Sequence, residues 1–203
     1  KKRMERMFEA FVFDKRLILV IKEIENGVFF ENNDFQLEVY QLEHGIETLG
    51  YRFAEKDKRR MDIKKVKKFG VPVGPLLGKL QHGKAIEYNS KKITPEDVTY
   101  IQTGKKIAYI TDTVLCDNCY KIADNADLLI CEATYSSKLV DKSEEYGHLT
   151  AKLAAQIANG SNAKQLILIH FSARYKNTQE LEEDARSIFD NVICAKDFMK
   201  IEI

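Results

Sequence analysis

The sequence has no tryptophan, only four cysteines and three prolines, and ten glycines among its 203 residues. So little proline and glycine argues against a disordered or low-complexity chain. Four cysteines are too few for a disulfide scaffold, so we expect a reducing, cytoplasmic location. No apolar run approaches the ~20 residues that span a bilayer, and we predict no membrane partner. The net charge of +1 excludes a uniformly basic nucleic-acid-binding protein but not a local basic patch.

What is present indicates a layered α/β fold. Apolar residues make up 44% of the chain, and the length suits one domain of about 100–200 residues with an insertion. We expect an amphipathic helix over residues 1–13, strands within 17–53, and strand–helix alternation after residue 91, with short strands at the C-terminus. The sequence begins at Lys1 rather than Met, so we expect it to be a fragment.

A basic segment interrupts this pattern. Residues 56–68 hold eight Lys or Arg and two Asp, net +6, so the other 190 residues sum to −5. Glycine and proline follow at once in GVPVGPLLGKL. Such a stretch between strands predicts a flexible arm, at residues 55–90, inserted into a domain that spans 1–203. A solvated helix face is the simpler alternative, since most charge runs are no more than that.

Histidines and carboxylates follow the predicted strands. His44, Asp112, Glu132 and His170 each lie at or just after the end of a strand, and His148 precedes a helix. Strand ends meet at one edge of an α/β sheet, where sites are built. Imidazole and carboxylate suit Zn²⁺ or Mn²⁺. Each residue alone is more often a structural rim residue than a ligand, so spacing alone predicts a metal site only weakly.

The sequence motifs around these residues are a more specific signal than the spacing. The chain contains, in this order, HGIETLGYRF (44–53), ITDT (110–113), CEAT (131–134), YGHLTAKLAA (146–155) and HFSARY (170–175). Together they resemble ribonuclease Z, the tRNA 3′-processing endonucleases of the metallo-β-lactamase superfamily. The resemblance implies a metallo-β-lactamase-like αββα sandwich, here incomplete because its N-terminal part is absent. The basic segment lies where that family carries its tRNA-binding arm.

The resemblance also implies roles for individual residues. His44 and His170 would be terminal ligands of two zinc ions (or Mn²⁺), with Asp112 bridging them. His148 with Glu132 would handle the proton of the departing ribose oxygen, and Arg174 and Ser172 would contact the phosphate. The expected RNA-binding residues are Lys56, Lys58, Arg59, Arg60, Lys64, Lys65, Lys67, Lys68, Gly74 and Pro75. Precursor tRNA would be the substrate and a homodimer the assembly, each arm serving the other subunit's site.

One departure from the family changes the expectation for this chain. The family's H-x-H-x-D-H motif is missing: no histidine precedes His44, and H-x-H occurs nowhere. Two protein ligands per ion, one of them shared, fall short of the three or four usual for zinc. We therefore expect the chain to be the C-terminal two thirds of such an enzyme and inactive alone. The alternatives are a non-catalytic RNA-binding remnant and another metallo-β-lactamase-fold phosphodiesterase.

Two further features lie outside the matched motifs. His82, in LQHGKAIE, is expected to be an exposed residue of the arm. Cys116 and Cys119 form a C-x-x-C pair, which is compatible with a redox dithiol or half of a zinc site. The simpler interpretation is packing, with Cys116 near a helix N-terminus and Cys119 on that helix.

Overall fold

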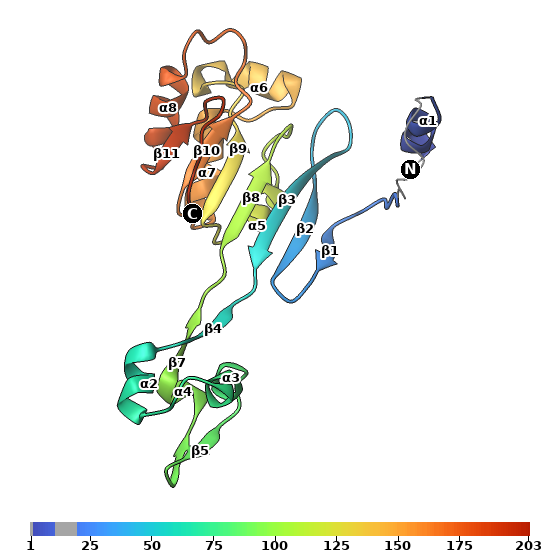
Figure 1. Cartoon of the computed structure of the whole chain (residues 1–203). Helices are drawn as coiled ribbons and strands as arrows, with labels where there is room; N and C mark the ends of the chain where they lie inside the picture. The colour runs from blue at the N-terminus through green and yellow to red at the C-terminus, as the bar shows by residue number, and fades with distance from the viewer. Residues whose placement is uncertain (1, 11–19) are drawn as a thin grey trace.

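The computed structural model describes residues 2–10 and 20–203. Its main body is a mixed seven-stranded sheet in the order β1-β2-β3-β8-β9-β10-β11 (Figure 1). The strands β8, β9, β10 and β11 run parallel, and β1, β2 and β3 pair antiparallel with their neighbours. The bounds are β1 (Gly27–Glu31), β2 (Phe35–Leu42), β3 (Thr48–Glu55), β8 (Lys106–Ile110), β9 (Leu128–Glu132), β10 (Leu166–Ile169) and β11 (Val192–Cys194).

Helices cover one face of this sheet. They are α5 (Asp117–Ala123), α7 (Ala151–Gly160) and α8 (Gln179–Arg186), whereas α6 (Val140–Tyr146), after a 3₁₀ turn (Ser137–Leu139), lies beyond the ends of the strands (Figure 1). The core lies between α5 and α7 and the sheet, where Ile110, Leu129, Leu168 and Ile157 are fully buried. On the sheet, Tyr51 and Tyr109 form a cross-strand pair and are 39% and 38% exposed. The predicted α/β class is confirmed, and in the described residues the main body has one seven-stranded sheet and one helical layer.

The chain ends differ from the prediction in part. The N-terminal helix α1 (Lys2–Ala10) is present, and residues 11–13 of the expected helix lie outside the described residues. Residues 20–25 form no strand, and the first strand begins at Gly27. At the other end only Val192–Cys194 is a strand. Both β1 and β11 are edge strands of the sheet.

A separate small module is inserted between β3 and β8. It comprises β4 (Lys58–Met61), α2 (Ile63–Phe69), α3 (Pro75–Gln81), β5 (Ile86–Tyr88), β6 (Lys91–Ile93), α4 (Pro95–Val98) and β7 (Thr99–Gln102). It has its own buried core of Val66, Val71, Leu80, Ile86, Ile93 and Val98. We call residues 58–102 the basic module. It extends beyond the expected boundary at residue 90, because β7 returns along β4 and the two strands form its stalk.

The basic module and the far edge of the sheet lie at opposite ends of β8. The module joins the sheet where β3 ends at Glu55 and β8 begins at Lys106, whereas β8 ends at Ile110. Figure 1 shows the module projecting away from the sheet at this end. In the described residues no helix is long and apolar enough to cross a membrane.

Candidate metal centre

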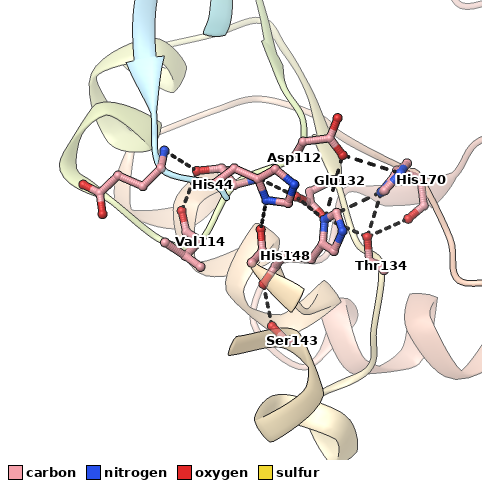
Figure 2. Close-up of polar contacts among 11 residues, drawn as sticks. His44, Asp112, Val114, Glu132, Thr134, Ser143, His148 and His170 are labelled. Carbon is pink, nitrogen blue, oxygen red and sulfur yellow. Dashed lines mark hydrogen bonds and ion pairs between the residues drawn. The ribbon is translucent and has the colours of Figure 1, made fainter. Parts of the chain in front are cut away.

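Strand direction brings the predicted residues to one edge of the sheet. The parallel strands β8, β9 and β10 end together, at Ile110, Glu132 and Ile169. Strand β2 is antiparallel to β3, which is antiparallel to β8, so β2 ends at this edge too. His44 follows β2, Asp112 follows β8, Glu132 ends β9 and His170 follows β10. Figure 2 shows these side chains facing one another, as the positions of the strand ends predict.

His148 joins the group from the loop between α6 and α7. Its ring centroid lies 5.0 Å from that of His44 and 5.1 Å from that of His170. Its Nδ1 lies 3.1 and 3.2 Å from the two carboxylate oxygens of Glu132, and 3.9 Å from Asp112 Oδ1. Because a carboxylate only accepts, Nδ1 carries the hydrogen. The predicted His148–Glu132 pair is therefore present as a contact.

Glu132 is completely buried, and each of its oxygens is held by a donor besides His148. Oε1 accepts from the backbone N–H of Thr113 at 2.8 Å, and Oε2 accepts from the Thr134 hydroxyl at 2.7 Å. A buried carboxylate needs such partners because an unpaired one is costly to desolvate. The result is a fixed acceptor that orients the His148 ring.

Thr134 is a residue to which the sequence analysis assigns no role. Its hydroxyl lies 2.7 Å from Glu132 Oε2 and 2.8 Å from His170 Nδ1. With its one hydrogen donated to the carboxylate, the hydroxyl oxygen accepts from Nδ1–H of His170. That leaves the lone pair of His170 on Nε2, which lies 3.6 Å from Asp112 Oδ1. The only signal in the sequence for this role is that Thr134 belongs to the motif CEAT (131–134).

Gly147 is a second residue that the sequence analysis passes over. Its carbonyl accepts a hydrogen bond from His44 Nδ1 at 2.8 Å, so His44 also keeps its lone pair on Nε2. The glycine has φ +73°, and a Cβ there would lie 2.7 Å from His44 Nδ1. Only glycine combines this backbone angle with such a close approach to the ring.

Two of the candidate ligands occupy an unfavourable backbone conformation. Asp112 has φ 49° and His170 has φ 57°, both in the left-handed region. For residues other than glycine this costs on the order of 1–3 kcal/mol, and such strain gathers at functional sites. His170 directly follows the last residue of β10, and Asp112 is the second residue after the end of β8. The backbone turns there to aim the side chain across the edge of the sheet.

The donor set fits a divalent metal ion. One ligand atom each of Asp112, His148 and His170 lies within 4.8 Å of the others. The predicted ligands are His44, Asp112 and His170. The compact group found in the residues that the structure describes has His148 in place of His44. The nitrogen of His148 that faces Asp112 is already engaged by Glu132. Two imidazoles and a carboxylate are ligands that zinc and manganese accept.

Arg174 and Ser172 lie beside this group in the loop after β10. Arg174 Nε donates to the Ser172 hydroxyl at 3.0 Å, and its guanidinium lies 4.9 Å from the centre of the Tyr135 ring. Tyr135 in turn lies 6.5 Å from the His148 ring. The backbone N–H of Ser172 donates to Thr134 at 3.1 Å, which fixes the loop to β9's end. Arg174 is exposed, so its guanidinium is open to an anionic ligand.

The predicted RNA-binding residues divide into two groups. Lys56, Lys58 and Arg59 form ion pairs with Glu31, Asp34 and Glu96, and Arg60 donates to Gln102. The lysines of α2 are exposed. Lys65 lies 3.9 Å from Asp62, and no ion pair is formed by Lys64, Lys67 or Lys68 in the part of the chain that the structure describes.

The remaining arm residues lie near α2. Gly74 and Pro75 are exposed at the start of α3, with proline as its first residue. His82 directly follows α3 and is exposed, as expected, with its Nδ1 2.7 Å from the Gly78 carbonyl. The free positive charge of the predicted set therefore concentrates on one short helix.

Known proteins resemble this chain along nearly its whole length. Residues 79–171 match the Beta-lactamase superfamily domain. The chain is 37% identical over 200 residues to a ribonuclease Z of Protochlamydia amoebophila, covering 98% of this chain and 65% of that protein. It is 36% identical over 205 residues to a ribonuclease Z of Archaeoglobus fulgidus, covering 98% of this chain and 67% of the relative.

A solved structure of a protein of this kind also resembles the fold of this chain. Human tRNase Z, short form, has a TM-score of 0.53 and 28% sequence identity, over 87% of this chain and 46% of the human chain. The chain thus spans about two thirds of the length of the two bacterial and archaeal relatives. The expectation that it corresponds to their C-terminal two thirds stays a prediction.

Proposed function

The chain belongs to the ribonuclease Z family, and we propose that the protein is a metal-dependent endoribonuclease that removes the 3′ trailer from tRNA precursors. The observation that carries this proposal is the meeting of Asp112, His148 and His170 above a buried Glu132 at one edge of the sheet. These residues combine metal-ligand and proton-transfer chemistry in one place, which phosphodiester hydrolysis requires.

In this proposal Asp112 and His170 hold metal, with His44 as a further ligand. His44 and His170 both present Nε2, because Gly147 and Thr134 hold their Nδ1 atoms. The carboxylate of Asp112 would offer both of its oxygens to the metal. Zinc or manganese held by these residues would activate water as the nucleophile and would neutralise charge on the phosphate.

His148 is the candidate proton donor. Glu132 holds its Nδ1 hydrogen, so the ring has a fixed orientation and its Nε2 is the atom that exchanges a proton. Protonated at Nε2, the imidazolium assists departure of the ribose 3′-oxygen. In this role His148 acts beside the metal rather than as a ligand, in agreement with the engagement of Nδ1 by Glu132.

Arg174 and Ser172 are the candidate phosphate contacts. The guanidinium is planar and bidentate, suited to two phosphate oxygens. Its Nε already bonds to Ser172 and its face lies over Tyr135, so its position is restricted before RNA binds.

The basic module supplies the candidate tRNA-binding surface. Phosphate contacts by lysines dominate sequence-independent affinity for RNA, and α2 carries four exposed lysines. The module projects from the end of the sheet opposite the metal centre. A homodimer, in which one subunit's module serves the other's site, reconciles this separation with a single bound tRNA.

The test uses the protein made from its own gene, with any residues encoded before Lys1. It is loaded with Zn²⁺ or Mn²⁺ and incubated with a 3′-extended tRNA precursor, and the product ends are mapped. We expect one cut at the trailer junction, lost in H148A and in D112N. The 203-residue chain, assayed in parallel, is expected to lack cleavage because its ions have too few protein ligands.

Other outcomes favour the alternatives. tRNA binding without metal uptake or cleavage indicates a non-catalytic RNA-binding protein. Cleavage of a small phosphodiester but not of precursor tRNA indicates a different phosphodiesterase. Metal content by elemental analysis and subunit number by light scattering complete the comparison. A cytoplasmic location, predicted from the cysteine content, is part of the same proposal.

A further inference from the structure

Two of the four cysteines lie in contact at the start of α5. Cys116 immediately precedes α5 and Cys119 lies on it, as the packing interpretation of the sequence predicts. Their sulfur atoms are 3.6 Å apart. A disulfide requires about 2.05 Å between sulfurs, so a small rotation of the side chains brings these two within bonding distance. The two other cysteines, Cys131 and Cys194, are both buried.

The two sulfurs of the pair are not equivalent. Cys116 is partly exposed, whereas Cys119, on α5, is completely buried and points toward the Val114 carbonyl. The hydrogen bond from the Cys119 thiol lowers the pKa of Cys116 to about 6 and raises that of Cys119. Cys116 is therefore the more accessible and the more acidic thiol of the pair, and the Cys119 thiol is held against it.

The buried cysteines provide an internal contrast. Burial raises the pKa of Cys131 well above its ordinary value and that of Cys194 to about 11. Cys194 donates to the Thr178 carbonyl at 3.7 Å rather than to a second sulfur. Reactivity toward disulfides follows thiolate content and access, so both properties single out Cys116.

We propose that Cys116 and Cys119 form a thiol–disulfide exchange site that takes small-molecule disulfides, with Cys116 as the attacking and Cys119 as the resolving sulfur. In the first step the Cys116 thiolate bonds to one sulfur of the small disulfide, whose S–S bond breaks and releases a thiolate that takes up a proton. In the second step Cys119 loses its proton and bonds to the Cys116 sulfur, which displaces the second small thiol. Two electrons pass from the protein to the small disulfide, and the protein is left with an intrachain disulfide.

This site lies beyond the proposed nuclease function and does not depend on it. Three residues separate Cys116 from Asp112 in the sequence, and the sulfur atoms contact each other and the Val114 carbonyl. The reverse exchange with an excess of small thiol restores the dithiol, so the site is compatible with a reducing compartment.

The test uses oxidised glutathione as the probe. The reduced protein is treated under argon, quenched with acid at intervals, and analysed by intact mass and peptide mapping. We expect the wild-type chain to lose the mass of two hydrogens, with the new bond joining Cys116 to Cys119 and no glutathionyl group retained. The variant C119A is expected to gain one glutathionyl group on Cys116, and C116S none.

The control is C194S, which removes a buried cysteine outside the pair and is expected to react as the wild-type chain does. Because C119A changes a buried side chain and can affect folding, the disulfide map of the wild-type chain decides independently. A wild-type chain that keeps the glutathionyl group, or that forms its disulfide elsewhere, overturns the proposal. Equal modification of Cys116 and Cys194 in the folded protein overturns it as well.

Discussion

The edge of the sheet and the basic module use polar residues in opposite ways. At the edge, Glu132 is buried and Asp112, His148 and His170 contact one another, although the chain between the first and last of them runs through two strands and three helices. In the module the charged side chains of α2 are exposed on one continuous segment, over a core of their own. The first arrangement fixes individual atoms relative to one another, and the second presents positive charge to the solvent.

This difference determines what each region tolerates. A site built from five segments depends on the whole sheet, and a change at one ligand removes the chemistry. A surface that acts through summed charge loses affinity gradually, one contact at a time. Four predictions follow this contrast, beginning with the change of largest effect.

Asp112→Asn should have the largest effect. The amide keeps the size of the side chain but removes the charge and one acceptor oxygen that a bridging ligand needs. We expect a loss of metal affinity greater than the roughly 10–100-fold typical of residues behind the ligands. Isothermal titration with Zn²⁺ measures it, and D141N, at an exposed position on α6, is the control. Equal affinities for D112N and wild type would contradict the assignment.

Leu80→Ala should open the module and leave the metal centre intact. Leu80 is completely buried in the module core, and such truncations cost about 2–5 kcal/mol. Hydrogen exchange should rise across residues 58–102 and stay unchanged in β9 and β10. The control is V73A, since Val73 is 95% exposed. Faster exchange in β9 and β10 as well would show that the two regions unfold together.

The sequence predicts the edge of the sheet better than the module. Apolar strands ending in His44, Asp112, Glu132 and His170 indicate where side chains meet, because parallel strands share a direction. The limits of the module depend on β7 pairing with β4 across forty residues, which no local pattern records. The sequence also does not predict the residues that hold the ligands in place, because their contacts likewise join distant parts of the chain.

Thr134 and Gly147 show this most clearly. Thr134 contacts His170 from a position 36 residues away, and Gly147 contacts His44 across 103 residues. Nothing in the residues near either one distinguishes a hydroxyl that sets a histidine tautomer from an ordinary strand-end threonine. These contacts follow from loop paths that only the folded sheet defines.

Thr134→Val should have an intermediate effect. Valine keeps the shape but removes the hydroxyl, so Glu132 loses a donor and His170 Nδ1 loses its acceptor. We expect metal affinity to fall by roughly 10–100-fold, with T134S restoring most of it because serine keeps the hydroxyl. Zinc titration separates this loss from a folding defect, which circular dichroism monitors. T103V, at an exposed threonine, is the control, and full affinity in T134V would exclude the tautomer role.

Charge reversal of Lys64, Lys65, Lys67 and Lys68 should have the most graded effect. Each lost phosphate contact lowers the slope of log K against log salt by about 0.7 for single-stranded and 0.9 for duplex nucleic acid, so tRNA binding should weaken and its salt dependence flatten. Zinc affinity should stay unchanged, because the metal centre lies at the other end of the sheet. Two double variants provide the control. K67Q/K68Q removes two charges that form no ion pair in the described residues. K56Q/K58Q removes two charges that already form ion pairs with Glu31 and Asp34. An equal loss of tRNA affinity in both double variants would show that net charge, not the exposed face of α2, governs binding.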